Sequence, residues 1–207
     1  EEFATQLKEQ FGLPSFPLMH TTSWLCYHRY GWSFAEARQI AQVRKSTKPM
    51  LFIHGDKDNF VPFSMLRPLY DAKTKGRKAM YVANKVRAEG MLHIAYMYNH
   101  DLGYNVLLPD LYGHGRSQGN HIQMGWDDRW DVMRWAEVAN SLFRPSRAAS
   151  TRMVVHGISM GAATTMAVSG EPTSSYIKCF VEDCGYSGVW EEFATQLKEQ
   201  FGLPSFP

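Results

Sequence analysis

The residues best suited to chemistry lie in the segment Met153–Ala163, MVVHGISMGAA, which contains a Gly-x-Ser-x-Gly motif centred on Ser159. A short β-branched run precedes the motif, and small or helix-forming residues follow it, which predicts a strand, a sharp turn and a helix. Such a turn lifts the serine hydroxyl clear of the backbone, and glycines on both sides spare a clash between a Cβ and the neighbouring strand and helix. Ser159 is therefore the candidate nucleophile.

The backbone N–H of Met160 is the candidate donor to an oxyanion. It follows the serine at the start of the expected helix, where the helix dipole and the unpaired N–H groups favour a negative charge. Together these features are typical of acyl transfer through a covalent intermediate on serine. The alternative is a glycine-rich turn between a strand and a helix that contains a serine by chance.

The elements that must position this serine alternate along the chain. Apolar runs predict strands at 49–54, 79–83, 104–110 and 177–184 besides the one before Ser159, and helices are expected over 63–75, 85–100, 126–143 and 160–169. Strands that are continuously apolar and alternate with helices predict an α/β fold, in which a mostly parallel sheet is covered by helices on both faces.

The composition indicates one domain without a nucleic-acid or membrane partner. The chain has 207 residues and a net charge of +2, and its charged residues form no basic stripe. Cys26, Cys179 and Cys184 lack metal-ligand spacing, which predicts free thiols in a reducing, cytoplasmic compartment and no metal or other cofactor. No apolar run approaches the roughly 18 residues of a membrane span, and the first residues do not resemble a signal peptide.

Residues 1–17 and 191–207 are the same sequence, EEFATQLKEQFGLPSFP. Phe3, Leu7 and Phe11 fall at helical spacing, so both copies are expected to form a helix that fits the same groove. Only one copy can occupy a single groove in a monomer. The other is left over, finds a different site, or docks on a second molecule in a domain swap, so a homo-oligomer through this segment is one expectation.

The segment 18–48 is rich in aromatic residues and is expected to form two helices that act as a lid or cap over a pocket. The first is expected around Trp24–Tyr30. The second is expected after Ser33, because Ser33 as an N-cap and Glu36 three residues later match a capping box. The alternative for the first helix is a surface helix with a buried aromatic face.

Four blocks together resemble the α/β-hydrolase superfamily, in particular bacterial serine esterases and peptidases of the dienelactone-hydrolase and prolyl-oligopeptidase-like branch. The blocks are YNVLLPDLYGHGRSQG, MVVHGISMGAATTM, IKCFVEDCGYSGVW and PMLFIHGDKDNFVP. The resemblance implies the α/β-hydrolase fold and a serine hydrolase that acts on carboxylic esters or, less often, amides, without a cofactor.

The order of the blocks departs from the superfamily, in which the HGDKD block follows the other three and precedes a histidine loop. Here it comes first. The second repeat copy ends at Pro207, where Leu18 would continue, so the chain resembles a circular permutation whose cut region is duplicated. Two family features lack a secure counterpart: the loop that gives a second oxyanion N–H, and the histidine loop. Both fall at the short join 84–90.

The resemblance places the triad acid at Asp58 and leaves Asp56 as a turn residue, with a solvent-exposed turn as the alternative for both. For the base it offers His93, because GMLHIAY loosely matches the family's histidine loop. Alternatively, Met91–Gly103 is the helix before the strand at 104–110, and His93 has no catalytic role. The other histidines are expected to be structural or on the surface: His54 and His156 in strands, His114 in the GHG loop, and His20, His28, His100 and His121.

Two functions of different classes follow. In the first, Ser159 attacks a small ester or a peptide, a histidine takes the proton, Asp58 orients that histidine, and the N–H of Met160 stabilises the oxyanion. In the second, the chain is a catalytically impaired hydrolase-fold scaffold, permuted or domain-swapped, which has lost its base and its oxyanion loop.

Overall fold

The computed structural model describes residues 15–55, 61–83 and 91–201. The chain divides into two compact units, of which the first comprises residues 1–38 and 187–207 and the second residues 39–186. Each unit is described here by itself. That the two together make one domain stays a prediction.

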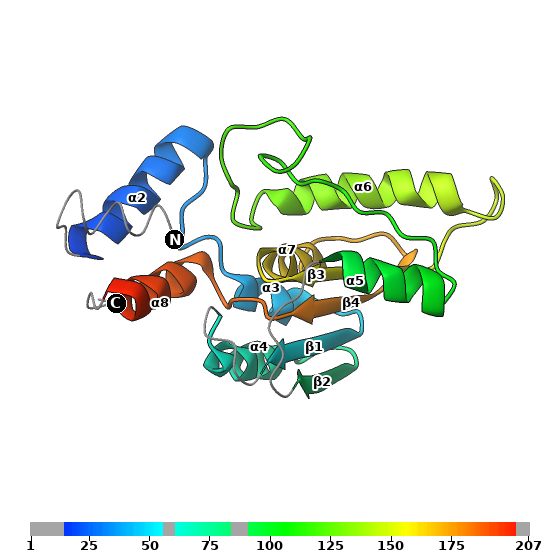
Figure 1. Cartoon of the computed structure of the whole chain (residues 1–207), viewed down its shortest axis with the longest axis horizontal. Helices are drawn as coiled ribbons and strands as arrows, with labels where there is room; N and C mark the ends of the chain where they lie inside the picture. Colours follow the sequence, from blue (N-terminus) through cyan, green and yellow to red (C-terminus); the bar gives the residue numbers. More distant parts are fainter. Residues whose placement is uncertain (1–14, 56–60, 84–90, 202–207) are drawn as a thin grey trace. The chain divides into compact units, whose positions relative to one another are not determined.

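In the first unit, helix α2 (Ser15–Tyr30) packs against helix α8 (Val189–Phe201), and the loop 31–38 follows α2 (Figure 1). The N–H of Ser33 donates to Glu36 Oε2 at 2.7 Å, as a capping box requires. The carbonyl of Ser33 accepts hydrogen bonds from the N–H groups of Glu36 and Ala37, which closes one turn. The next N–H, that of Arg38, donates to the carbonyl of Glu36 and not to the carbonyl four residues before it, so the turn does not continue into a helix. The predicted start of the second helix is therefore wrong, and that helix begins only at Gln39.

The second unit holds the sheet. Its strands are β1 (Met50–Gly55), β2 (Lys78–Ala83), β3 (Met153–Ile158) and β4 (Ile177–Asp183). Its helices are α3 (Gln39–Lys45), α4 (Leu66–Ala72), α5 (Met91–Tyr96), α6 (Asp128–Phe143) and α7 (Met160–Ser169), with a short 3-10 helix η1 (Phe63–Met65) and a π-helical segment η2 (Met97–Asp101).

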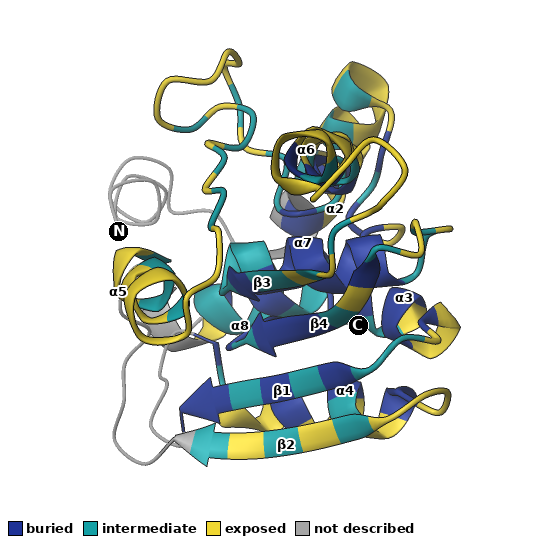
Figure 2. Ribbon diagram, turned by 90° about the vertical axis from the view of Figure 1, so that its right-hand side faces the viewer, coloured by how far each residue is buried: buried dark blue, intermediate teal, exposed yellow. Residues whose placement is uncertain are grey.

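Within the described residues, the four strands form one parallel sheet in the order β2-β1-β4-β3 (Figure 2). In the sheet, Asp183 pairs with Ile53 on one side and with Ile158 on the other, so β4 and β3 end at the same level and β1 runs two residues further, to Gly55. The predicted α/β class with a parallel sheet flanked by helices is confirmed. The step from β2 to β3 along the chain crosses from one edge of the sheet to the other.

One face of the sheet carries the core. Phe52 of β1, Phe180 of β4 and Met166 of α7 have no exposed surface and belong to one cluster with residues of α3 and α4. The opposite face is only partly covered, since Tyr81 is 62% exposed and Val154 is 39% exposed. The prediction that helices cover both faces is therefore wrong for part of the second face.

The strand predicted at 104–110 is not formed. The N–H of Tyr104 donates to the carbonyl of Tyr98 at 2.8 Å, and the carbonyl of Tyr104 accepts from Asn99 Nδ2 at 2.9 Å, so this backbone closes the end of η2 instead of pairing with a strand. At the other end, Asp110 accepts from the N–H of Arg116. An apolar run needs a partner strand to become a strand, and here the local hydrogen bonds replace it.

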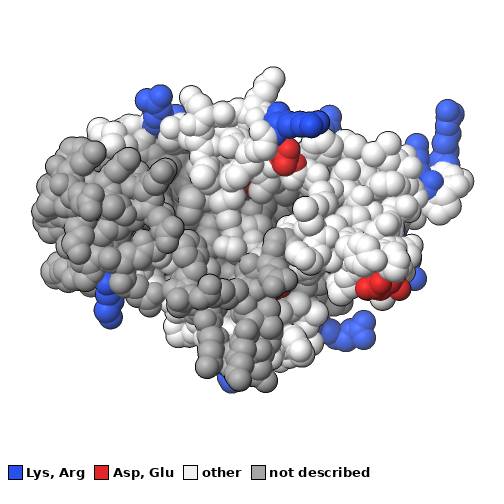
Figure 3. Space-filling model, in the orientation of Figure 1, with Lys and Arg blue, Asp and Glu red and all other residues white. Residues whose placement is uncertain are grey.

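The surface of the described residues gives few further features. On the face seen in Figure 3, the Lys and Arg side chains lie at separate points and form no band. None of the described helices has the length and apolar character needed to cross a bilayer. The three cysteines form no disulfide, and the compartment stays a prediction.

A buried carboxyl at the start of α6 predicts a pH dependence of stability. Asp128 accepts a hydrogen bond from the N–H of Gly125 at 2.9 Å, and burial raises the pKa of its carboxyl to about 6. The protonated carboxyl therefore contributes to the stability of the folded chain. This contribution is present in full below the pKa of the group in the unfolded chain, about 4, and is lost as the pH rises through about 6.

We therefore expect Asp128→Asn, which keeps an oxygen acceptor for Gly125, to raise the melting temperature relative to the parent chain at about pH 7 and to lose this advantage at about pH 4. Thermal unfolding of both proteins across that range measures the difference. An advantage that is the same at both pH values contradicts the buried, charged carboxylate.

Candidate functional site

Ser159 lies where β3 meets α7, and its backbone is strained. Its φ is 55° and its ψ is −117°, a conformation that residues with a side chain rarely adopt. The N–H of Ser159 donates to the carbonyl of Asp183 at 2.8 Å, and its carbonyl accepts the helical bond of Ala163 at 3.0 Å. The predicted succession of strand, sharp turn and helix is confirmed.

The two glycines of the motif have different roles. A Cβ on Gly157 would overlap the carbonyl oxygen of Gly161, so only glycine allows β3 and α7 to approach this closely. A Cβ on Gly161 would meet no described atom within 4 Å. Against the described residues, the prediction that both glycines spare a clash is confirmed for Gly157 and wrong for Gly161.

The hydroxyl of Ser159 is half-buried and makes no capping bond to the helix that it precedes. Met160 is the first residue of α7, so its N–H has no partner within the helix. The geometry therefore leaves a hydroxyl and an N–H without a partner in the helix on successive residues, at the positive end of a ten-residue helix. This pair can hold an acyl carbon and a developing oxyanion.

The carboxyl ends of three strands are tied in a row beside this serine. Asp183 accepts from the N–H of Ser159, and the N–H of Cys184 donates to the carbonyl of Ile53 at 2.8 Å. Cys184 itself has a φ of 56°. The chain that leaves β1 therefore starts from the same edge as Ser159, two strands away, which is roughly 10 Å.

The position of the expected acid relative to Ser159 is outside what the structure describes. Asp58 and the turn residue Asp56 lie outside the described residues. What the structure places is the strand end from which they follow, at Gly55.

The expected base, His93, lies on α5, and its side chain is exposed. The segment from Met91 to Asp101 is helical, as the alternative interpretation of His93 predicts. Among the described residues, no hydrogen bond joins a histidine to the Ser159 hydroxyl. The role of His93 as a base stays a prediction.

Three other histidines make structural contacts. His54 is fully buried and its Nε2 donates to the carbonyl of Val61 at 3.0 Å. His156 Nδ1 is hydrogen-bonded to the Tyr98 hydroxyl at 3.1 Å, and burial lowers the pKa of its imidazole. In the GHG loop, His114 Nδ1 donates to the carbonyl of Tyr112 at 3.0 Å. These partners agree with the structural roles expected for the three side chains.

Sequence reasoning missed Glu182, which lies next to the sharp turn between β3 and α7 that carries Ser159, here called the elbow. It pairs with Gly157 in the sheet, is fully buried, and accepts from the N–H of Gly185 at 3.1 Å. Burial raises the pKa of its carboxyl well above the ordinary value. A Cβ on Gly185 would approach Met166 Cε to 2.6 Å, so this carboxyl and the packing of α7 hold the turn after β4.

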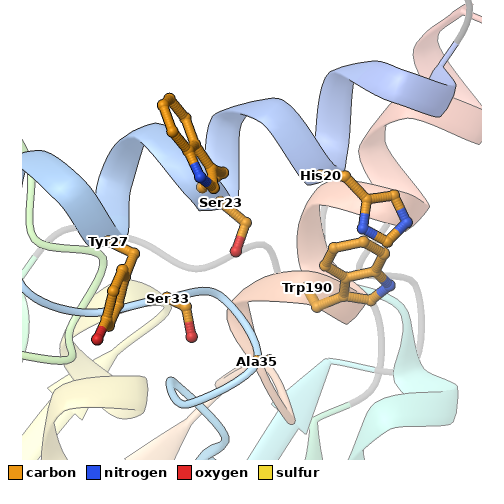
Figure 4. A pocket seen from close by; sticks show the side chains of 7 residues that line it. His20, Ser23, Tyr27, Ser33, Ala35 and Trp190 are labelled. Atoms are coloured by element: carbon orange, nitrogen blue, oxygen red, sulfur yellow. The ribbon is translucent and has the colours of Figure 1, made fainter.

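The first unit has a separate pocket of about 530 Å³. In Figure 4, the side chains of α2 and the ring of Trp190 surround it, and the ring centroids of His20 and Trp190 lie 4.9 Å apart. Its lining residues are His20, Ser23, Trp24, Tyr27, Ser33, Ala35 and Trp190. Such a surface suits a flat apolar group. Among the described residues, no group of three His, Cys, Asp or Glu could hold a metal.

A segment of 83 residues is 36% identical to the protein named "Uncharacterized protein YqkD" from Bacillus subtilis strain 168. The match covers 40% of this chain and 27% of that relative. No protein-family profile matches the chain. No solved structure matches it.

The unequal glycines give a paired prediction. Gly157→Ala is expected to lower the free energy of unfolding by about 1–3 kcal/mol, because backbone atoms must move to accept the new Cβ. Gly161→Ala is the matched control, and we expect it to be neutral or stabilising by up to about 1 kcal/mol, since alanine favours the helix. Denaturant unfolding measures both. Equal effects of the two substitutions would show that the strand and helix do not meet at Gly157.

Proposed function

We propose that this protein is a serine hydrolase of the α/β-hydrolase fold, in circularly permuted order, which cleaves carboxylic esters through an acyl-enzyme on Ser159. The observation that carries the proposal is the backbone of Ser159, with a positive φ between a strand and a helix. Strain of this kind persists only where the surroundings enforce it, and it is often found at functional sites.

The order of the strands supports the permutation. Starting at Met153, continuing to Pro207 and resuming at Leu18, the chain passes through β3, β4, β1 and β2, the order in which they lie side by side in the sheet. Consecutive strands usually neighbour one another, so the jump from β2 to β3 is explained by a changed starting point. The described helices nearest the two ends, α2 and α8, contact each other within the first unit, as a join between the ends requires.

In the proposed reaction, the Ser159 hydroxyl attacks the ester carbonyl and gives its proton to a histidine. The N–H of Met160 stabilises the oxyanion, the alcohol leaves with the proton, and water then hydrolyses the acyl-enzyme. Asp58 orients the histidine, for which His93 is the candidate. Amides and peptides are a less favoured substrate class because their leaving group is poorer.

A second function has one observation in its favour. His93 is exposed on α5, and the Ser159 hydroxyl makes no hydrogen bond to a described histidine. A scaffold without a base would retain the elbow and fold but would not turn over substrate. Hydrolysis of a p-nitrophenyl ester that depends on Ser159 separates the two functions.

For the enzyme, we expect a fluorophosphonate probe to label Ser159, and Ser159→Ala to abolish both labelling and hydrolysis of a short p-nitrophenyl ester. Asp58→Asn should lower kcat by about 10⁴-fold, as in other triads, whereas the neighbouring Asp56→Asn serves as a control and changes it little. Labelling that persists in Ser159→Ala would contradict Ser159 as the nucleophile. Equal losses of kcat in the two aspartate variants would contradict Asp58 as the acid.

A further inference from the structure

Helix α8 is held in the first unit by side chains of the repeated segment. The Phe193 ring stacks on Phe34 with centroids 5.1 Å apart and planes inclined by 21°. Leu197 is 7% exposed. At the start of the helix, Glu191 Oε1 lies 4.0 Å from Arg38 Nη2. We call the surface of α2 and the loop 31–38 that receives residues 191–197 the α8 seat.

The side chains of residues 191–197 that occupy the α8 seat occur a second time at the start of the sequence. Residues 1–7 are identical to residues 191–197, so Glu1, Phe3 and Leu7 match the three contacts described above. The first copy is also joined closely to the seat, because α2 begins at Ser15 and only a few residues separate it from the end of the repeated helical pattern. Short links of this length connect antiparallel helix pairs.

We propose that the α8 seat is bistable: residues 1–7 of the same molecule exchange with residues 191–197, so the protein has two folded states that differ in which copy is bound. The side chains from the repeat are the same in both states, so their contributions to the binding free energy cancel. Only the attachments of the two copies to the rest of the chain decide the populations.

Each attachment favours a different state. Val189, which has no exposed surface, and Trp190, which packs on His20 (Figure 4), precede the second copy alone and stabilise the state with α8 bound. The short link to α2 gives the first copy a high effective concentration at the seat. The two contributions oppose each other, and under the proposal they are close enough in size for both states to be populated.

The occupant is the same molecule's first copy, not that of a second molecule. Each chain has one seat and two copies, so a swap between molecules fills no additional seat. It does, however, cost the translational and rotational freedom lost on association. The exchange is therefore intramolecular and independent of protein concentration.

A double-mutant cycle on the phenylalanines tests the exchange. If either copy can fill the seat, Phe3→Ala and Phe193→Ala should each lower the melting temperature by less than about 2 °C, and the double variant by about 5 °C or more. If α8 alone fills the seat, Phe193→Ala should show the whole loss and Phe3→Ala should add nothing, which would overturn the proposal. A double variant as stable as the parent chain would also overturn it.

Two further measurements identify the occupant. A Lys8→Arg marker, matching the exposed Lys198, gives the otherwise identical peptides different masses. Hydrogen exchange should then show protection moving from residues 191–197 to residues 1–7 in Phe193→Ala. Light scattering should find this variant monomeric at all concentrations. Protection that stays on 191–197, or a dimer that forms in Phe193→Ala but not in the double variant, contradicts exchange within one molecule.

Discussion

The close approach of β3 and α7 is the constraint on which the rest of the site depends. With glycine at 157, the strand runs directly under the carbonyl of Gly161, and the single residue at the bend must take up the change of direction. Ser159 does so with a positive φ, and its hydroxyl makes no capping bond to the helix that begins at the next residue, Met160. A strained residue persists only where its surroundings hold it, so the neighbouring strand must contribute as well.

That contribution comes from the hydrogen bonds between strand ends. Asp183 fixes the N–H of Ser159, and Ile53 fixes the N–H of Cys184, so two residues with positive φ follow two adjacent strands at the same edge of the sheet. The buried Glu182 accepts a hydrogen bond from the N–H of Gly185 and so supports the turn that follows β4. The edge of the sheet that carries the candidate nucleophile and the end of β1 at Gly55 is thus held by main-chain bonds, which depend little on the identity of the side chains.

Sequence patterns predicted correctly those elements whose formation depends on residues close together in the chain. The apolar runs of β1, β2 and β4 and the elbow with α7 follow from residue types within a few positions. The run at 104–110 has an equally apolar sequence but forms no strand, because strand formation depends on a partner that sequence patterns do not reveal. For the same reason, burial of Glu182 and the open space at Gly161 depend on how β4 and α7 pack, and sequence alone missed both.

The repeat bears on which segment occupies the α8 seat, whereas the elbow bears on whether Ser159 reacts. The elbow can be tested at atomic level by a crystal structure of the protein after reaction with a fluorophosphonate. The account predicts phosphorus bonded to Ser159 Oγ, with the phosphoryl oxygen about 2.7–3.1 Å from the backbone nitrogen of Met160. An adduct whose oxygen points away from Met160, or an unmodified Ser159 beside a labelled residue elsewhere, would contradict it.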